Sequence, residues 1–344
     1  MNKTIKTILL LAAALAAALA AAGCAKTPEE GANDANVRYF NAWMEVNYPD
    51  LQPSGLGIYV IEEEEGTGVE VKEDGFIIAD YVISDLEGNI SSYTSKDIAK
   101  QLGTFDTTAY YGPKVLTTIK TTIQAGLADA VIGMKAGGRK KVIIPSWLMT
   151  YKSYDDPADY LKNSSTGTNT IYDITIRDFA DSINNYEISQ IEKYIKANPE
   201  TFNSKIVNDT TGFYYQPIED GNASEKFAKD TTIYINYTGR LLNGQVFDTT
   251  DEKIAKDNGI YSSSRTYEPT RINWGEKYTD ITMGSSKSST IKGFALTLWH
   301  MNPMSKGIGI FTSALGYSYN GSGASIPGYA PLIFEIEIVD EPED

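Results

Sequence analysis

The sequence is poor in histidine and cysteine. His300 and Cys24 are the single residues of their types. One imidazole excludes chemistry that needs two, and one thiol excludes intrachain disulfides, Cys-x-x-Cys redox motifs and thiolate zinc sites. Cations are also scarce, since 30 Lys and Arg stand against 45 Asp and Glu, for a formal net charge of −15. Binding to nucleic acid requires clustered cations that release counterions, so we expect no nucleic-acid partner.

Long hydrophobic runs are missing except near the start. A short basic segment precedes an apolar run over residues 8–22. The run is too short for a stable membrane span, and it predicts a secretory signal peptide over residues 1–23. Cys24 follows small residues at the expected cleavage point, which resembles the bacterial lipobox, although Ala21 stands where that pattern prefers Leu. We therefore predict lipidation of Cys24.

The polar residues 25–36 predict a flexible tether between this lipid and the folded body. An acidic body is repelled by anionic lipid, so the membrane partner is reached through the acyl chains, of which more than one is needed for stable anchoring. We expect a lipid-anchored cell-envelope protein in the outer membrane of a Gram-negative bacterium. Glu29 and Glu30 leave open whether it faces the periplasm or the exterior.

The chain repeats itself after the tether. With 344 residues, 42% of them hydrophobic, it is long enough for two ordinary cores. At a constant offset of 156, the matching pairs are Tyr59 and Tyr215, Asp74 and Asp230, Tyr81 and Tyr237, Leu86 and Leu242, and Gly88 and Gly244. The same offset aligns Ile98-Ala99-Lys100 with Ile254-Ala255-Lys256. Self-similarity at a fixed spacing indicates a duplicated domain.

Each copy combines a predicted helix with an antiparallel sheet. At an offset of 167, Gly126, Leu127, Val131 and Met134 align with Gly293, Phe294, Leu298 and Met301, a spacing typical of one helix face. At an offset of 162, apolar and polar residues alternate over 172–177 and over 334–338, which indicates strands with one solvated face. The predicted fold class is therefore α+β.

Two further helices are predicted outside the copies. Apolar residues recur at helical spacing over residues 34–48 and again over 181–197, before Pro199. The predicted organisation is a signal peptide (1–23), a tether with an N-terminal helix (24–50), a first domain (51–178), a helical linker (179–204) and a second domain (205–344).

Five motifs of the second copy follow one another in an informative order. They are Tyr237-Thr238-Gly239, the segment Leu242 to Thr250 with Phe247-Asp248-Thr249-Thr250, Ile291-Lys292-Gly293-Phe294, Leu315-Gly316-Tyr317 and Ile326-Pro327. Each is weak alone, but together over residues 212–340 they resemble FKBP-type peptidyl-prolyl cis/trans isomerases. The resemblance implies two tandem FKBP-like domains, each an antiparallel half-barrel sheet wrapped around one short helix, with an aromatic pocket between sheet and helix.

The resemblance also implies the pocket residues. The catalytic set is Tyr237, Phe247, Asp248 and Tyr317, and the substrate-binding set is Ile291, Phe294, Ile326 and Phe334. In this set Asp248 would accept a hydrogen bond from Tyr237, and Tyr317 would donate one to a substrate carbonyl. An apolar pocket can favour the twisted X-Pro amide without a nucleophile or proton transfer, so neither a cofactor nor a metal is expected.

Each of these residues also has a plainer interpretation. The aromatic side chains could be ordinary core, Asp248 could cap a turn, and Tyr317 could cover the core. Two departures bear on activity. Phe294 stands where the family often has Trp, and the segment between Thr250 and Met283 is longer than usual and could cover the pocket.

The first copy lacks the polar pocket residues. At an offset of 156, Ser91-Ser92 stand opposite Phe247-Asp248, and at an offset of 167 Thr150 stands opposite Tyr317. Phe105-Asp106-Thr107-Thr108 repeats the motif of the second copy, but its register places it opposite residues 261–264, so we reject it as a site. We expect a structural or binding role for this copy, and we interpret the acidic run 62–65 as a solvated turn.

The sequence thus predicts a peptidyl-prolyl cis-trans isomerase that assists the folding of exported proteins, with activity in the second domain and proline-containing polypeptides as clients. Two alternatives stay open. One is a non-catalytic lipoprotein that binds clients or ligands, and the other is a surface lipoprotein that binds glycans through some of its 23 tyrosines. Fold alone does not decide among them, and the oligomeric state is not indicated.

Overall fold

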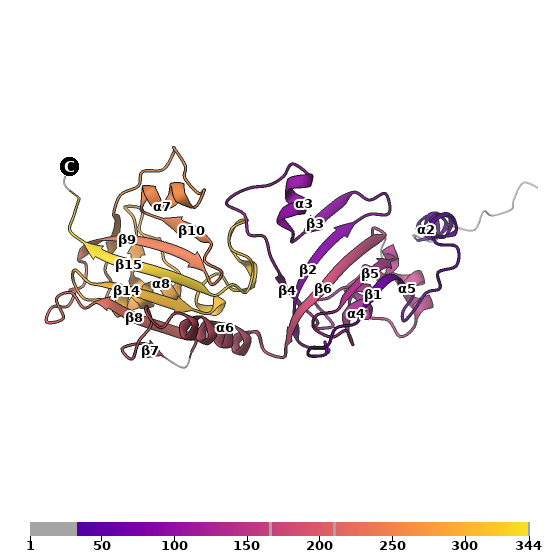
Figure 1. Cartoon of the computed structure of the whole chain (residues 1–344), viewed down its shortest axis with the longest axis horizontal. Coiled ribbons are helices and arrows are strands. Elements are labelled where there is room, and N and C mark those ends of the chain that lie inside the picture. Colours follow the sequence, from indigo (N-terminus) through magenta and orange to yellow (C-terminus); the bar gives the residue numbers. More distant parts are fainter. Residues whose placement is uncertain (1–32, 165–166, 209–210, 343–344) are drawn as a thin grey trace, which may run out of the picture.

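Two units of the same topology lie side by side along the long axis of the molecule (Figure 1). The computed structural model describes residues 33–164, 167–208 and 211–342. We refer to residues 33–180 as the first unit and to residues 181–342 as the second unit. The predicted signal peptide, Cys24 and most of the tether lie outside the described residues. Within the described ranges, no helix is long and apolar enough to span a membrane.

The first unit begins with the predicted N-terminal helix. Its elements are α2 (Asp34–Asn47), β1 (Tyr59–Glu64), β2 (Phe76–Ser84), β3 (Ile90–Tyr93), α3 (Lys96–Gln101), β4 (Lys114–Thr117), α4 (Ala125–Val131), β5 (Arg139–Ile144), η1 (Ser146–Leu148), α5 (Pro157–Asn163) and β6 (Thr170–Ala180).

The second unit begins with the predicted connecting helix. Its helices are α6 (Ile183–Ala197), α7 (Glu252–Asp257), α8 (Lys292–Trp299), η2 (Tyr278–Asp280), η3 (Ser313–Leu315) and η4 (Ser318–Asn320). Its strands are β7 (Val207–Asn208), β8 (Phe213–Glu219), β9 (Thr232–Leu241), β10 (Val246–Thr249), β11 (Thr270–Asn273), β12 (Thr282–Met283), β13 (Ser288–Ser289), β14 (Lys306–Phe311) and β15 (Leu332–Val339).

The two sheets share one strand order. The first runs β1-β5-β6-β2-β3, with β4 also paired to β2. The second runs through β8-β14-β15-β9, with β10 and β11 both paired to β9, and β12, β13 and β7 extend its ends. All the pairings between named strands are antiparallel. The predicted duplication of an antiparallel α+β fold is therefore confirmed.

Backbone conformation repeats along with the sequence. Asp74 and Asp230 adopt φ angles of 59° and 63°, which are uncommon for a residue other than glycine. Gly88 and Gly244, in the equivalent hairpin turns, have φ angles of 85° and 89°. The offset of 156 thus aligns local geometry as well as residue type.

A short helix packs in the hollow of each sheet. In β6 and β15 the buried side chains alternate with less buried ones as predicted, and they face α4 and α8 respectively. The helices begin with tight contacts: a Cβ on Gly126 would lie 2.3 Å from Ile144, and one on Gly293 would lie 2.3 Å from Phe311. Both helices are shorter than the predicted pattern, so Met134 and Met301 are buried just beyond their ends.

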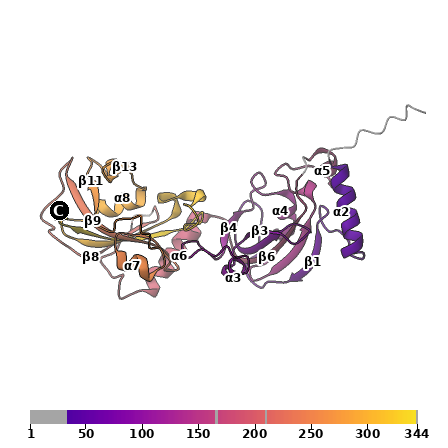
Figure 2. The same ribbon diagram turned by 90° about the horizontal axis from the view of Figure 1, so that it is seen from above.

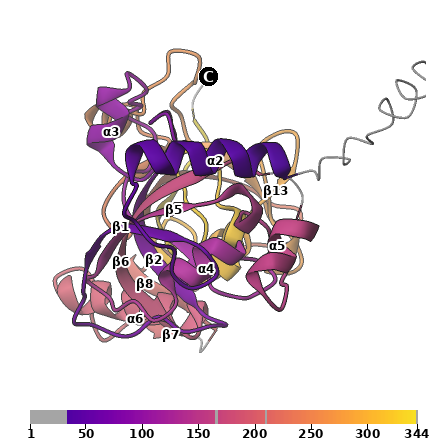
Figure 3. The same cartoon turned by 90° about the vertical axis from the view of Figure 1, so that its right-hand side faces the viewer.

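The outer face of each sheet carries a longer helix. In the first unit, Phe40 and Met44 of α2 pack on Ile143, and Figure 3 shows α2 crossing that face. In the second unit, Ile191 of α6 packs with Ile310 and other side chains of the opposite sheet face. The N-terminal and connecting helices are thus counterparts, a relation that the sequence offsets did not reveal.

The acidic run corrects one expectation. Residues 62–64 are not a solvated turn; they belong to strand β1, which pairs with β5. Arg139 lies 2.8 Å from Glu62, and Lys140 lies 3.0 Å from Glu63. Cations on the neighbouring strand allow the carboxylates to follow one another along an extended backbone.

Candidate active site

The eight predicted pocket residues surround a single cavity of the second unit, with a volume of about 470 Å³. Its lining includes Tyr237, Phe247, Asp248, Ile291, Phe294, Tyr317, Ile326 and Phe334. They come from the central strand β9, from β10 and β15, from the start of α8 and from the residues 316–331 that precede β15, which we call the rim loop. Segments that are distant in the sequence thus contribute to the lining of one cavity.

Three pairs of aromatic rings in the cavity lining meet edge to face. The ring of Phe334 lies 5.5 Å from that of Phe247 and 5.0 Å from that of Phe294, both edge to face. Tyr237 meets Phe294 in the same way at 5.7 Å. Edge-to-face pairs are favourable and hold each ring in one orientation. Phe294, which stands where the family often has Trp, is therefore held in one orientation in the cavity lining.

Tyr237, Asp248 and Arg265 form a hydrogen-bonded polar group beside these aromatic rings. The Tyr237 hydroxyl donates to a carboxylate oxygen of Asp248 at 2.7 Å, and the other oxygen forms an ion pair with Arg265. The guanidinium also donates to the Tyr237 hydroxyl at 3.4 Å. Asp248 keeps 34% of its side chain exposed, so the group remains accessible from solvent. The predicted hydrogen bond between Tyr237 and Asp248 is present.

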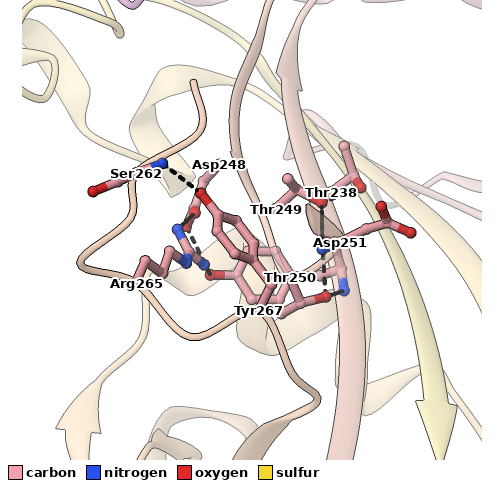
Figure 4. A network of polar contacts seen from close by, with 9 residues as sticks. Thr238, Asp248, Thr249, Thr250, Asp251, Ser262, Arg265 and Tyr267 are labelled. Atoms are coloured by element: carbon pink, nitrogen blue, oxygen red, sulfur yellow. Dashed lines mark hydrogen bonds and ion pairs between the residues drawn. The ribbon is translucent and has the colours of Figure 1, made fainter. Parts of the chain in front are cut away.

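Threonines behind the pocket fix the strand that carries Tyr237 (Figure 4). The Tyr237 N–H donates to the Thr250 hydroxyl at 2.9 Å. The Thr249 hydroxyl donates to the Tyr237 carbonyl at 3.1 Å and lies 2.9 Å from the Thr238 hydroxyl. All three threonines are buried, so their hydrogen bonds are made in a low-dielectric setting. The strand position of Asp248 relative to Tyr237 is thereby set.

The two phenols of the pocket are held as neutral donors. Burial is the main reason that the pKa of Tyr237 is raised, and the negative charge of Asp248 adds to it. Burial followed by the charge of Asp248 also raises the pKa of Tyr317. Among the residues that the structure describes, the Tyr317 hydroxyl has no hydrogen-bond partner. It is therefore available to donate to a bound molecule.

Arg265 comes from the long segment that the sequence marked as unusual. We call residues 258–269 the pocket loop; it follows α7 and leads into β11. Within it the Ser262 N–H donates to the Tyr267 hydroxyl at 2.9 Å, and the Arg265 guanidinium lies over the Tyr267 ring at 5.4 Å (Figure 4). The loop thus approaches the cavity from the Asp248 side and supplies the cation there.

Ser92 of the first unit occupies the strand position that is equivalent to Asp248, so the first unit lacks the carboxylate of the polar group there. Asp248 stands opposite Gly239 in the β9–β10 ladder, and Ser92 stands opposite Ile83 in the β2–β3 ladder, the same register at an offset of 156. Phe105-Asp106 lies beyond α3, away from that ladder. Across residues 33–164, 167–208 and 211–342, no three His, Cys, Asp or Glu side chains are placed to hold a metal ion.

Sequence reasoning did not identify Arg265 or the polar part of the lining, which includes Ser288, Ser289, Thr290, Ser322 and Ser325. Arg265 was detectable in principle, since it is a cation in the one long insertion after Asp248. The serines carry no sequence signal of this kind. His300 lies outside the lining; it ends α8 and stacks on Phe213 at 5.5 Å.

Residues 223–339 match the family of the FKBP-type peptidyl-prolyl cis-trans isomerase, which confirms the resemblance of the second copy. A probable FKBP-type peptidyl-prolyl cis-trans isomerase of Haemophilus influenzae is 26% identical over 145 residues, 42% of this chain and 49% of that protein. The FKBP-type 22 kDa peptidyl-prolyl cis-trans isomerase of Escherichia coli is 26% identical over 149 residues, 43% of this chain and 58% of that protein. The chain thus spans about half the length of these relatives.

Among solved structures, FkpA from Escherichia coli is similar with a TM-score of 0.31 and 22% identity, over 45% of this chain and 59% of that one. The crystal structure of the 3 FKBP domains of wheat FKBP73 is similar with a TM-score of 0.27 and 13% identity, over 83% of this chain and 95% of that one.

Proposed function

We propose that the protein is a peptidyl-prolyl cis-trans isomerase and that its activity resides in the pocket of the second unit. The observation that carries the proposal is the group formed by Tyr237, Asp248 and Arg265 at the edge of an aromatic cavity. The family match over residues 223–339 supports the same reaction. The first unit lacks this group at the equivalent strand positions, so we assign it no turnover.

The chemistry follows from the peptide bond. Rotation about the bond costs roughly 18–20 kcal/mol because amide resonance is lost in the twisted form. The twisted amide has less charge separation than either planar isomer, so an aromatic pocket receives it at a lower desolvation cost. Phe247, Phe294 and Phe334 supply the walls that would hold the proline ring. No proton transfer or covalent step is required.

The polar residues would orient the peptide. Tyr317 would donate to the carbonyl that follows the proline, while Asp248 would face the carbonyl carbon of the rotating bond. Because Asp248 is already held by Tyr237 and Arg265, its orientation does not have to be reached during the reaction.

The test is turnover of a chromogenic Xaa-Pro peptide by the full chain. We expect the chain to isomerise the peptide faster than the spontaneous reaction. Uncatalysed isomerisation of an Xaa-Pro bond takes tens to hundreds of seconds at 25 °C. Asp248→Ala should lower kcat/KM at least tenfold, which corresponds to about 1.4 kcal/mol. Tyr317→Phe removes one hydrogen bond, worth about 0.5–1.5 kcal/mol, and should lower kcat/KM by about two- to tenfold.

A matched control is available in the duplicated unit. Tyr81 occupies the position equivalent to Tyr237, so Tyr81→Phe should leave turnover unchanged while Tyr237→Phe reduces it. A folded chain without activity would refute the isomerase and favour a non-catalytic binding protein. Equal loss in Tyr81→Phe and Tyr237→Phe would refute the assignment to the second unit.

We further propose that the substrates are exported proteins and that the chain is held at the cell envelope by lipid on Cys24. The sequence of residues 1–24 motivates the proposal. Labelling with a radioactive fatty acid should mark the wild-type chain and not Cys24→Ser. The substrate class is tested by refolding a secreted protein whose slow phase is proline isomerisation, which the chain should accelerate.

A further inference from the structure

A loop of the first unit reaches the second unit. We call residues 102–113, between α3 and β4, the bridging loop; Figure 2 shows that segment beside the second unit. The Thr107 hydroxyl donates to the Gly259 carbonyl at 2.7 Å, and the Tyr110 N–H donates to the Ala324 carbonyl at 2.8 Å. The Gln245 side-chain amide donates to the carbonyls of Thr108 and Ala109, each at 3.3 Å. Three segments of the second unit are therefore contacted at once.

Two of these segments lead directly to the polar group of the pocket. Gln245 is in the turn between β9 and β10, two residues before Phe247. Gly259 is in the pocket loop that carries Arg265, and its φ angle of 69° is one that L side chains rarely adopt. The bridging loop thus holds the backbone on both sides of the ion pair between Asp248 and Arg265.

The third segment is the rim loop. Ala324 immediately precedes Ser325 and Ile326, which both line the cavity. Tyr329, farther along the same loop, meets Phe76 of the first unit edge to face at 5.6 Å. Tyr329 has a φ angle of 60°, an uncommon conformation for an aromatic residue. The rim loop is therefore contacted by the first unit at two points, which flank the pocket-lining residues Ser325 and Ile326.

The side chain of Tyr110 completes the contact. Its ring packs against the hydrophobic core of the second unit, while its hydroxyl donates to the Pro113 carbonyl at 3.0 Å. Burial raises the pKa of this tyrosine. A first-unit side chain thus fills space at the junction, with its hydroxyl tied back to its own loop.

The bridging loop and the pocket loop share one internal arrangement, a stacked pair of aromatic rings and a hydrogen bond to the second ring. Phe105 stacks on Tyr111 at 5.7 Å, and Tyr261 stacks on Tyr267 at 5.5 Å. In both loops the second ring's hydroxyl accepts a backbone N–H, at 3.0 Å and 2.9 Å. The offset of 156 places Ala109 opposite Arg265. At this position the second copy has Arg265, which pairs with Asp248. The first copy has Ala109, whose backbone carbonyl accepts a hydrogen bond from Gln245 of the second unit.

We propose that the bridging loop is a positioning element for the pocket of the second unit, with Tyr110 as its anchor. It orders the rim loop and the pocket loop so that a polypeptide meets a formed cavity. The proposal rests on the proposed isomerase function for its kinetic consequence. The docking itself does not depend on that function, and the experiment separates the two.

The experiment compares Tyr110→Ala, Tyr110→Phe and wild type in the full chain. Loss of the ring should raise KM for a proline peptide about fivefold or more, with a smaller change in kcat, because the cavity walls are less often in place. Amide hydrogen exchange in residues 316–331 and 258–269 should accelerate in Tyr110→Ala. Tyr110→Phe keeps the ring and should resemble wild type. Tyr151→Ala, an exposed tyrosine of the first unit, is the matched control and should change neither quantity.

Gln245→Ala tests the contact from the other side, and it serves if Tyr110→Ala does not fold. It removes two hydrogen bonds to the bridging loop and should raise KM and exchange in the same direction. Unchanged exchange in both loops in Tyr110→Ala and Gln245→Ala would overturn the proposal. An inactive wild-type chain would refute the isomerase function, while faster exchange in the variants would still establish the docking.

Discussion

The buried carboxyl of Glu187 makes the stability of the second unit depend on pH. Glu187 lies on α6 and is 2% exposed. One of its oxygens accepts the Ser313 N–H and the other accepts the Ser313 hydroxyl, each at 2.6 Å. Despite these two donors, burial raises its pKa from 4.5 to about 7. The carboxyl ties α6 to η3, which immediately precedes Gly316 and Tyr317 of the pocket.

The sign of the effect follows from linkage. In the unfolded chain the carboxyl titrates near 4.5, whereas in the folded chain it holds its proton up to about pH 7. Its contribution to stability is therefore fully present below about pH 4.5 and is lost progressively as the pH rises to about 7. At about 1.4 kcal/mol per pH unit, the loss amounts to about 3 kcal/mol. For a domain of this size that corresponds to a fall in Tm of about 6–12 °C.

Glu187→Gln removes the titration and keeps the shape. The amide can accept the Ser313 N–H and donate to the Ser313 hydroxyl, as the protonated acid does. Scanning calorimetry from pH 4.5 to 8 should show the difference in Tm between Glu187→Gln and wild type widening with pH in favour of the variant. Glu192→Gln, an exposed position on the same helix, controls for removal of a charge. Parallel Tm profiles for Glu187→Gln and wild type would refute the reasoning.

Three other substitutions test packing and capping. A Cβ on Gly239 would lie 2.5 Å from the Phe247 ring. Gly239→Ala should therefore lower the free energy of unfolding, measured by urea denaturation, by about 1–3 kcal/mol and reduce peptide turnover. An unchanged free energy of unfolding and unchanged turnover would contradict the packing of the pocket. Phe311 is fully buried, so Phe311→Ala should lower the free energy of unfolding by about 3–5 kcal/mol in the same urea assay. A smaller loss would argue against a tightly packed core. As the N-cap of α7, Asp251 accepts the Ile254 N–H at 2.8 Å. Asp251→Ala should lower the free energy of unfolding by about 1 kcal/mol. An unchanged free energy of unfolding would show that the cap is dispensable.

Much of the fold was predictable because it depends on short-range patterns. The helix predicted over residues 34–48 spans Asp34–Asn47, and that predicted over 181–197 spans Ile183–Ala197. The strand alternation near the end of each copy was visible because one face is buried and the other is solvated. The candidate pocket residues came from a different source: the order of five motifs resembled a family, and the family's pattern supplied the residues.

Interactions between distant segments were not predictable in this way. The ion pair between Arg265 and Asp248 joins residues 17 apart across an irregular loop, where no periodicity constrains a side chain. The acidic run of β1 was misread because its partners, Arg139 and Lys140, lie on a strand more than 70 residues away in the chain. The docking of the bridging loop was not predictable because the acceptors of its hydrogen bonds are backbone carbonyls, which every residue type provides.

The two Phe-Asp-Thr-Thr segments show why register outweighs residue type. In the second unit the first three residues of the segment belong to strand β10, which pairs with β9, and Asp248 accepts a hydrogen bond from Tyr237. In the first unit it follows α3, where Asp106 accepts the N–H and hydroxyl of Thr108 within its own turn and Thr107 bonds the neighbouring unit. The same four residue types therefore contribute Phe247 and Asp248 to the cavity lining in one copy, and in the other contribute Thr107 and Thr108 to the contact between the units. The contact between the units requires none of the pocket's carboxylate chemistry, so a copy that lacks the polar pocket residues can still make it.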